Sequence, residues 1–521
     1  MNVRKNFLKT VFILTGIAIA STAVFADNPI ISHRYTADPN AMVYNGRVYV
    51  FCSNDDDNNG SYGLSSYIIV SSDDMANWTD HGEVFRVPRD ASWATRAYAP
   101  TAIERDGKFY LYFPNSGSNI GVAVADRPEG PYKDTLGKAL IDKSTPNGNV
   151  EWIFDPAIFI DDDGTPYLYF GGGQNLGSNL RGIKLKEDMI SISGSAEKIN
   201  APKGFEASFM HKYEGKYYFS YAASSWNSTI EYLIGDSPLG PFTHKGVILD
   251  NPSINGKNIN GSNNSHASIV EFKGQWYMFY HDRRISGGNT HKRDVSVDLL
   301  TYNNDGTIKK VIVTAESVPQ IKNFNPYDTV QCETMDKQSG IETDKCSEGG
   351  MMLTDISDGD YTSLSKADFG DGATGFAIRA SSKSGGGKVE LHLGSKTGGL
   401  VGTCEIGETG SWDTWKTFEC AIADCRGVDD LYLVYKGSGE PFRLNWFKFE
   451  SPTNVVSSVK WSSRNHITDR RRLSITISDR NSPFQSGSSM FTLTGRVLQQ
   501  KKRLKNSGAG SRGVMLIVPE K

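Results

Sequence analysis

Short segments of alternating apolar and polar residues, each broken by a glycine-containing turn, recur along the N-terminal part of the chain. An aromatic-rich strand follows every turn, so each copy is typical of a β-hairpin. The five copies are YNGRVYVF (44–51), RDGKFYLYF (105–113), DDGTPYLYF (162–170), YEGKYYFSY (213–221) and FKGQWYMFY (272–280). Their glycines lie 61, 57, 51 and 59 residues apart. A hairpin repeated at this period indicates a β-propeller, and five copies predict five blades of four strands.

One position of the repeat carries charge where solubility does not require it. Eight or nine residues before the five glycines, the strands begin with Asp38, Ala99, Asp155, Glu206 and His266. The first strand of a propeller blade lines the central axis, so we expect these side chains to converge near one mouth. A structural role, in which the two aspartates cap turns before Pro39 and Pro156, is the alternative.

The pattern changes after the propeller segment at 27–318. A linker is predicted at 319–328, and a second domain at 329–450 shows short alternating strands such as KVELHLG (388–394). Such strands are typical of a β-sandwich, here of the jelly-roll kind. The chain is therefore predicted to be all-β, a five-bladed β-propeller followed by a β-sandwich module.

The two ends of the chain differ in composition from its body. Residues 1–26 combine a basic start, an apolar stretch and a small residue at the end, which predicts a signal peptide and a secreted or cell-surface protein without a transmembrane segment. Residues 451–521 hold 13 Lys and Arg against 3 Asp and Glu, a balance of +10, and are predicted to be a Ser-rich spacer with a basic tail that serves as a sorting signal. Five of the six cysteines fall in the second domain, which suggests disulfides in an exported chain.

Carboxylates meeting in one funnel suit the hydrolysis of glycosides. That reaction needs a carboxylic acid to protonate the leaving oxygen and a carboxylate to act on water or on carbon. A third carboxylate raises the pKa of the acid by like-charge repulsion and helps to position it. Asp38, Asp155 and Glu206 supply such a trio.

The segments ADPNAMVYNGRVYVF, FDPAIFIDDDGTPYLYFGG and EASFMHKYEGKYYFSYA resemble glycoside hydrolase family 43 across nearly all of 30–315. The resemblance implies a five-bladed propeller that inverts configuration. It implies that Asp38 is the general base, Glu206 the general acid, and Asp155 the group that modulates the pKa of Glu206 and orients it. No cofactor is expected for the chemistry.

Further residues are assigned to substrate binding. The resemblance places His266 on the axis, where it holds water or a calcium ion, and implies that Arg293 reaches the sugar. Aromatic side chains stack on sugar rings, and core packing is the alternative for each of them. The aromatic candidates at the rim are Trp93, Trp152, Phe154 and Trp226.

The second domain resembles carbohydrate-binding module family 6, through phrases such as DGDYTSL and TGSWDTWKTFEC. The resemblance implies that Tyr361 and Trp412 grip a sugar, that Cys404 and Cys420 are bridged, and that Glu333 is a ligand of a structural calcium ion. The family's Asn-x-Asp-Trp phrase is replaced here by Arg443-Leu444-Asn445-Trp446, which departs at both polar positions.

These features predict a secreted enzyme that degrades hemicellulose in the plant cell wall. Removal of α-L-arabinofuranosyl groups from arabinoxylan is the favoured activity, with a β-xylosidase or an arabinan endohydrolase as enzyme alternatives and a catalytically silent sugar-binding propeller as the alternative without activity. We expect a monomer that binds arabinoxylan or xylan and no nucleic acid, because the body of the chain is acidic: without residues 451–521 it has 43 Lys and Arg against 56 Asp and Glu.

Overall fold

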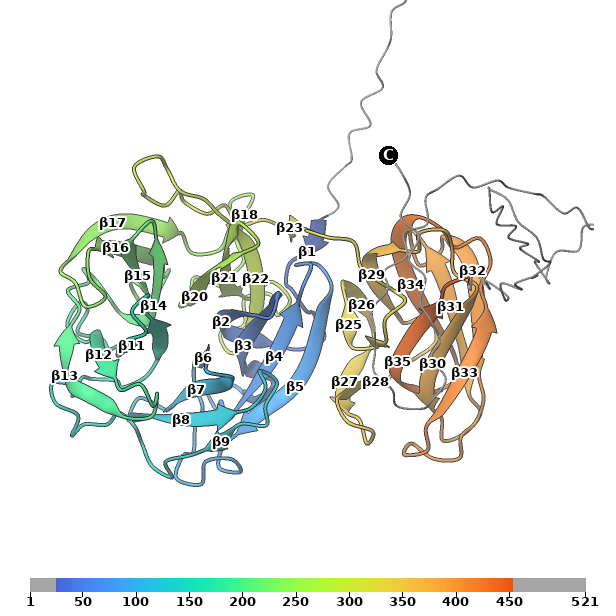
Figure 1. The fold of residues 1–521 in the computed structure, drawn as a ribbon, viewed down its shortest axis with the longest axis horizontal. Helices are drawn as coiled ribbons and strands as arrows, with labels where there is room; N and C mark the ends of the chain where they lie inside the picture. Colours follow the sequence, from blue (N-terminus) through green and yellow to red (C-terminus); the bar gives the residue numbers. More distant parts are fainter. Residues whose placement is uncertain (1–24, 453–521) are drawn as a thin grey trace, which may run out of the picture. The chain divides into compact units, whose positions relative to one another are not determined.

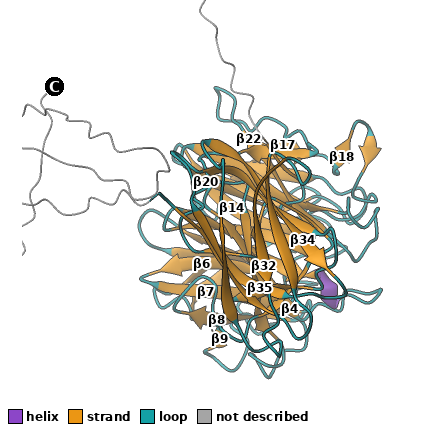
Figure 2. Cartoon of the chain, turned by 90° about the vertical axis from the view of Figure 1, so that its right-hand side faces the viewer, coloured by secondary structure: helices purple, strands orange, loops and turns teal. Residues whose placement is uncertain are grey.

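The structure is a computed structural model that describes residues 25–452. The predicted basic tail and all but the last two residues of the predicted signal peptide lie outside the described residues. Strands dominate the described part (Figure 2), where the only helix is the short 3₁₀ turn η1 (Asp55–Asp57). Within this part, no helix has the length and apolar character needed to cross a lipid bilayer.

Five antiparallel sheets follow one another along the first part of the chain (Figure 1). The first comprises β2 (Thr36–Tyr44), β3 (Arg47–Asn54), β4 (Ser66–Ser72) and β5 (Trp78–Arg86). The second comprises β6 (Thr101–Arg105), β7 (Lys108–Asn115), β8 (Asn119–Ala125) and β9 (Lys133–Asp134). The third comprises β10 (Ala157–Ile160), β11 (Pro166–Phe170), β12 (Arg181–Leu185) and β13 (Ile192–Lys198). The fourth comprises β14 (Glu206–Tyr213), β15 (Lys216–Ala222), β16 (Ile230–Gly235) and β17 (Phe242–Leu249). The fifth comprises β20 (Ala267–Phe272), β21 (Gln275–Asp282) and β22 (Asp294–Leu300).

The first strands of these sheets form a closed ring. In order around the ring, β2 lies against β6, β6 against β10, β10 against β14, β14 against β20, and β20 against β2 again. The repeated hairpins produce this arrangement, since the five turn glycines all have φ between 74° and 83°. In four of the turns the preceding residue also has positive φ, which is the backbone of a type I′ hairpin.

The fifth sheet differs from the expected pattern because it contains three strands rather than four. The segment after β22 turns back on itself, so that Tyr302 and Ile308 form only an isolated bridge. The chain then continues into β23 (Glu316–Pro319), which pairs with β1 (Phe25–Asp27). The N-terminal residues Asn28 and Ile30 hydrogen-bond directly to β22, at Val297 and Val295, on the side of the fifth sheet where a fourth strand would pair.

Two further sheets, built from residues 330–450, enclose a core of their own. One contains β27 (Glu342–Lys345), β28 (Met351–Thr354), β35 (Arg443–Glu450), β30 (Gly375–Ser381) and β33 (Lys416–Ala421), with β24 (Val330–Gln331) at β35. The other contains β26 (Lys337–Ser339), β29 (Tyr361–Asp368), β34 (Val428–Gly437), β31 (Gly387–Leu393) and β32 (Gly399–Ile406). Apolar residues alternate inward from both sheets, as expected for a β-sandwich.

One strand of this second region completes a sheet of the first. β25 (Thr334–Met335) pairs with β5, with Thr334 opposite Thr79. Beside this pairing, the buried Asp80 carboxylate accepts hydrogen bonds from Arg34 at 2.7 Å and from Thr343 at 2.7 Å. The edge of the first sheet is therefore hydrogen-bonded rather than open to solvent.

Candidate active site

A cavity of about 660 Å³ opens where the ring-forming strands begin. Asp38, Glu206 and Asp155 line it together, although they come from three different sheets. Arg293, directly before β22, also lines the cavity. The structure therefore brings the three carboxylates of the repeat into one site.

The backbone at these carboxylates is unusual. Asp38 has a φ of 49° and Asp155 a φ of 47°, and Ala207, which follows Glu206, has a φ of 57°. A residue other than glycine in the left-handed region costs about 1–3 kcal/mol, and such residues cluster at functional sites. The pairing of β2 and of β14 also shifts register next to these residues, which is a sign of bulges. Bulges re-aim side chains, and here they direct the carboxylates into the cavity.

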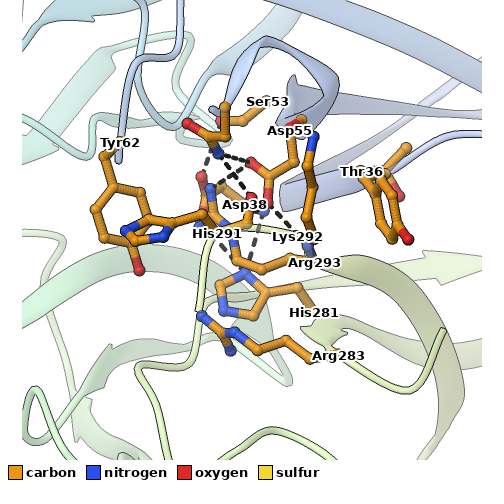
Figure 3. A network of polar contacts seen from close by, with 12 residues as sticks. Thr36, Asp38, Ser53, Asp55, Tyr62, His281, Arg283, His291, Lys292 and Arg293 are labelled. Carbon is orange, nitrogen blue, oxygen red and sulfur yellow. Dashed lines mark hydrogen bonds and ion pairs between the residues drawn. The ribbon is translucent and has the colours of Figure 1, made fainter. Parts of the chain in front are cut away.

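Asp38 is held by three hydrogen-bonding neighbours (Figure 3). Its Oδ1 accepts a hydrogen bond from Nη1 of Arg293 at 2.6 Å, and its Oδ2 accepts one from the Ser53 hydroxyl at 2.8 Å. The backbone N–H of Asp38 donates to Nδ1 of His281 at 3.3 Å. The carboxylate is thereby fixed in position while one edge still faces the cavity.

Arg293 is positioned in turn by Asp55. Nε and Nη2 of Arg293 donate to the two oxygens of the Asp55 carboxylate at 2.7 and 2.8 Å, a bidentate pair. Both side chains are buried, and Asp55 lies in η1. The short helical turn thus orients the arginine that contacts Asp38.

Charge keeps Asp38 ionised. Burial by itself would raise the pKa of this carboxyl, but the charge of the Arg293 guanidinium outweighs burial and holds the pKa well below its usual range. Asp38 is therefore a carboxylate at neutral pH, as a general base must be before it takes a proton.

Glu206 has the opposite environment. Burial raises its pKa to about 7, the hydrogen bond from Asn264 opposes this rise, and the charge of Asp38 adds to it. Burial also raises the pKa of Asp155 well above its usual range, with the charges of Glu206 and Asp38 as further causes. Asp155 accepts a hydrogen bond from the backbone N–H of Ala207 at 3.0 Å, directly beside Glu206. The buried pair therefore retains a proton at neutral pH.

His266 lies between two of the carboxylates. Its Nδ1 is 3.7 Å from Oδ1 of Asp38 and 3.8 Å from Oδ2 of Asp155. Burial lowers its pKa to about 4, so the imidazole is neutral at neutral pH. Its place in the ring agrees with its place in the sequence repeat, although it does not itself line the cavity.

The aromatic candidates are divided between the cavity and other surroundings. Trp152 and Phe154 both line it and meet edge to face, with ring centroids 5.4 Å apart. Trp93 instead donates its indole N–H to Asp134 and packs on Phe113. Trp226 is 67% exposed and does not line the cavity.

Several residues at this site did not stand out in the sequence. Tyr62 lines the cavity with its ring 5.5 Å from the Arg293 guanidinium, and Asn264 lines it while donating to Glu206. Asn264 lies only two residues before His266, which occupies the repeat position of the carboxylates. This closeness in sequence is a signal that could have placed Asn264 near the site. Asp55 lies in an acidic loop whose partner is more than two hundred residues away, and only the fold reveals that pairing.

The binding candidates of the sandwich lie in different elements, Tyr361 at the start of β29 and Trp412 in a loop. Trp412 is in the loop after β32, and Tyr361 has Lys396, from the loop before β32, 5.2 Å from its ring centre. The Trp412 ring is covered by the Arg443 guanidinium at 4.5 Å, and Arg443 is paired with Glu440 at 2.9 Å.

The calcium expectation has one feature in its favour. Glu333 is 3% exposed and its Oε2 has no hydrogen-bond partner among the described residues. Burial raises the pKa of this carboxyl well above its usual range. However, between residues 25 and 452 no group of three or more His, Cys, Asp or Glu side chains is arranged to hold a metal ion. A calcium ion at Glu333 would therefore depend on backbone carbonyl oxygens for most of its ligands.

Two family models match the chain. The model described as glycosyl hydrolases family 43 matches residues 26–308, and the one described as carbohydrate binding module (family 6) matches residues 331–451. These two matches correspond to the two regions that the sheets define.

Similar proteins match over both regions. An arabinoxylan arabinofuranohydrolase of Paenibacillus polymyxa is 39% identical over 83% of this chain and 76% of that protein. One of Bacillus subtilis (strain 168) is 38% identical over 85% of this chain and 95% of that protein. The crystal structure of a glycoside hydrolase family 43 arabinoxylan arabinofuranohydrolase from Bacillus subtilis in complex with cellotetraose is similar with a TM-score of 0.77 and 38% identity, covering 81% of this chain and 97% of that one.

Proposed function

Because the chain belongs to glycosyl hydrolases family 43 and carries a family 6 carbohydrate-binding module, we propose that it removes α-L-arabinofuranosyl side groups from arabinoxylan. The chain is a glycoside hydrolase that acts on hemicellulose. The choice of arabinose over xylose is the proposal. It rests on the two arabinoxylan arabinofuranohydrolases, which resemble this chain across the propeller and the sandwich together.

The mechanism follows from the two opposite carboxyl environments in one cavity, and this is the observation that carries the assignment of roles. Glu206, protonated near neutral pH, gives its proton to the glycosidic oxygen as the bond to the anomeric carbon breaks. Asp38, held ionised by Arg293, takes a proton from the water that attacks this carbon from the opposite face. Asp155 and Glu206 repel each other when both are ionised, which favours a state in which this buried pair keeps a proton and gives Asp155 its role beside the acid.

The aromatic walls of the cavity suit a sugar substrate. Trp152, Phe154 and Tyr62 present ring faces or edges around the carboxylates. Apolar faces of pentose rings pack on such surfaces, while the carboxylates and Arg293 satisfy the hydroxyl groups. The ring of five sheets supports a five-bladed propeller that carries this cavity at its mouth.

The substrate assignment is tested by product analysis with the full chain. Incubation with arabinoxylan, and separately with linear xylo-oligosaccharides, is followed by chromatographic measurement of free arabinose and free xylose. We expect arabinose from the first substrate and little xylose from the second. Release of xylose from the second substrate without arabinose from the first would establish the β-xylosidase alternative.

Inversion of configuration is a separate part of the proposal. An inverting site leaves room for water, so we expect the carboxyl groups of Asp38 and Glu206 to lie roughly 6.5–9.5 Å apart. Proton NMR of the first product formed shows the anomer directly. Detection of the retained anomer would mean that Asp38 acts as a nucleophile rather than as a base.

We also propose a structural calcium ion at Glu333 and export of the chain. Calcium binding is supported by the unpartnered Oε2 of Glu333 and predicts a higher melting temperature with calcium than with chelator. Glu333→Gln should remove this difference.

Export is supported by the composition of residues 1–26 and predicts that the protein recovered from culture medium begins at Asp27.

A further inference from the structure

A buried arginine without an acidic partner lies behind the general acid. Arg283 is 0% exposed, and no carboxylate among the described residues forms an ion pair with it. Its guanidinium donates instead to the side-chain oxygens of Asn260 and Asn264 and to the carbonyl oxygen of Thr290. Burial lowers its pKa to about 10, so it stays a cation at neutral pH. A buried unpaired charge is costly, which indicates that the site has another use for it.

The amide of Asn264 connects Arg283 to the catalytic carboxyl. Oδ1 of Asn264 accepts a hydrogen bond from Nη2 of Arg283 at 2.8 Å, and Nδ2 of Asn264 donates to Oε1 of Glu206 at 3.1 Å. A guanidinium has donors only, so the oxygen of the amide must face Arg283 and the NH₂ group must face Glu206. The arginine thereby fixes which way the amide points.

We propose that Arg283 and Asn264 are positioning residues that hold the Glu206 carboxyl with Oε1 occupied and Oε2 directed at the leaving oxygen of the substrate. This inference rests on the proposed role of Glu206 as general acid. Without Arg283 the amide can turn over, and its oxygen would then accept a hydrogen bond from the Glu206 carboxyl and direct the acidic hydrogen away from the substrate. Without Asn264 the carboxyl loses its hydrogen-bonded anchor.

The same pair also reaches the general base. The backbone carbonyl of Asn264 lies 3.2 Å from Nε2 of His281, whose Nδ1 accepts from the backbone N–H of Asp38. His281 is neutral at neutral pH because burial lowers its pKa to about 3. Asn264 therefore links the segments that carry acid and base, and a shift of this residue moves one relative to the other.

Four charged or titratable groups surround Glu206 and act on the pKa of its carboxyl together with Asn264. They are Asp155 before β10, Asp38 on β2, Arg293 before β22 and Tyr62 in the loop after η1. All four residues are retained in Asn264→Ala. Because the hydrogen bond from Asn264 favours the ionised carboxyl, its removal should raise the pKa of Glu206.

The test compares two substrates that differ only in leaving group. The pentoside type that the wild-type enzyme hydrolyses, whether arabinoside or xyloside, is prepared as a nitrophenyl glycoside and as a natural oligosaccharide. A nitrophenolate leaves without a proton, whereas a sugar alcohol needs one. Asn264→Ala should lower kcat on the oligosaccharide by roughly 10- to 100-fold, the loss expected for a misplaced catalytic group, and lower it much less on the nitrophenyl glycoside. The alkaline limb of its pH profile should move to higher pH.

Arg283→Lys provides a second, independent variant. It keeps the positive charge but loses the fork that holds both asparagines, so the same split between substrates is expected. Arg284→Lys is the matched control, because Arg284 is the neighbouring, partly buried arginine, pairs with Asp282 and does not line the cavity. It should leave the ratio of the two activities unchanged.

Equal losses on both substrates, with an unmoved alkaline limb, would overturn the positioning role. An unchanged kcat in Asn264→Ala would overturn it as well. If Arg283→Lys does not fold, Asn264→Ala decides the matter alone. Failure of the arabinose assignment would appear already in the wild-type products and leaves this comparison intact.

Discussion

Two carboxyl groups of similar intrinsic acidity are driven apart by their neighbours in this site. Asp38 touches a guanidinium that is itself fixed by Asp55, whereas Glu206 is buried beside other carboxylates and receives only an amide N–H. Their pKa values therefore move in opposite directions. Such divergence assigns acid and base without knowledge of the substrate.

The first prediction concerns the leaving group. Glu206→Gln should reduce hydrolysis of natural oligosaccharides by about 10²–10⁴-fold, the usual contribution of a general acid, and should affect nitrophenyl glycosides far less. Asp38→Asn should disable both, because every substrate needs activated water. Steady-state kinetics on the two substrates measure this directly. Equal proportional losses in the two variants would leave the roles of acid and base unsupported.

The second prediction concerns stability. Folding raises the pKa of Glu206 from its ordinary value of 4.5 to about 7, so the folded protein keeps a proton that the unfolded chain releases. Stability from this group is fully present below pH 4.5 and is lost as pH rises through 7. Glu206→Gln should therefore stabilise the protein at pH 8 by on the order of 3 kcal/mol and change little at pH 4. Urea unfolding at both pH values measures the difference, and equal stabilisation at both would contradict the shift.

The elements that carry the site could be predicted from the sequence because they repeat. The alternation of apolar and polar residues predicted the hairpins, and the period of the hairpins predicted the ring of strands. The shared position in the repeat predicted that Asp38, Asp155 and Glu206 lie together. The three-stranded fifth sheet could not be foreseen, since the segment after β22 turns back on itself and forms one isolated bridge, between Tyr302 and Ile308, instead of a fourth strand. The partners Asp55, Arg283 and Asn264 were also missed. Their roles depend on hydrogen bonds between distant segments, for which alternation contains no signal.

In the sandwich, the side chain of Arg443 covers the aromatic ring of Trp412, the residue expected to bind sugar. Arg443 lies on the face of Trp412 and is held there by Glu440, so the ring is occupied by a side chain of the same chain. A cation over an indole contributes about 0.5–2 kcal/mol. The substitution of asparagine by arginine in the family phrase thus has a physical consequence at the end of β32.

The third prediction follows from this covered ring. Arg443→Ala should expose Trp412 and tighten binding of the full chain to insoluble xylan by about 2- to 10-fold, which corresponds to the loss of the cation–π contact. Depletion assays with the Asp38→Asn background prevent hydrolysis during the measurement. Adding Trp412→Ala should abolish the gain. Unchanged retention in Arg443→Ala would mean that xylan is bound elsewhere on the module.

At the scale of the whole molecule, the catalytic and the binding region share a hydrogen-bonded sheet. β25 extends the sheet of β2 to β5, and the buried Asp80 is satisfied by Arg34 and by Thr343. Removal of the sandwich would leave β5 as an unpaired edge and take one donor from a buried carboxylate.

The fourth prediction is a single unfolding event. Since the two regions share strands, scanning calorimetry of the full chain should show one cooperative transition rather than two. A chain ending at residue 318 should melt at a lower temperature and associate through the exposed β5. Two separate transitions, with the lower one unaffected by removal of the sandwich, would contradict this coupling.

The shared strand also limits how this enzyme can be rearranged. A binding module that is joined only by a flexible linker can be exchanged freely. The exchange then changes which polysaccharide the enzyme binds and leaves the catalytic region unaffected. Here β25, which follows β24 in the module, also pairs with β5 and so extends a sheet of the catalytic region. A replacement module must supply its own two-residue strand that pairs with β5 in the same register. Without that strand, the exchanged protein would gain a new binding specificity but fold less stably. An exchange that keeps β25 with the enzyme therefore has to cut after Met335, between β25 and β26.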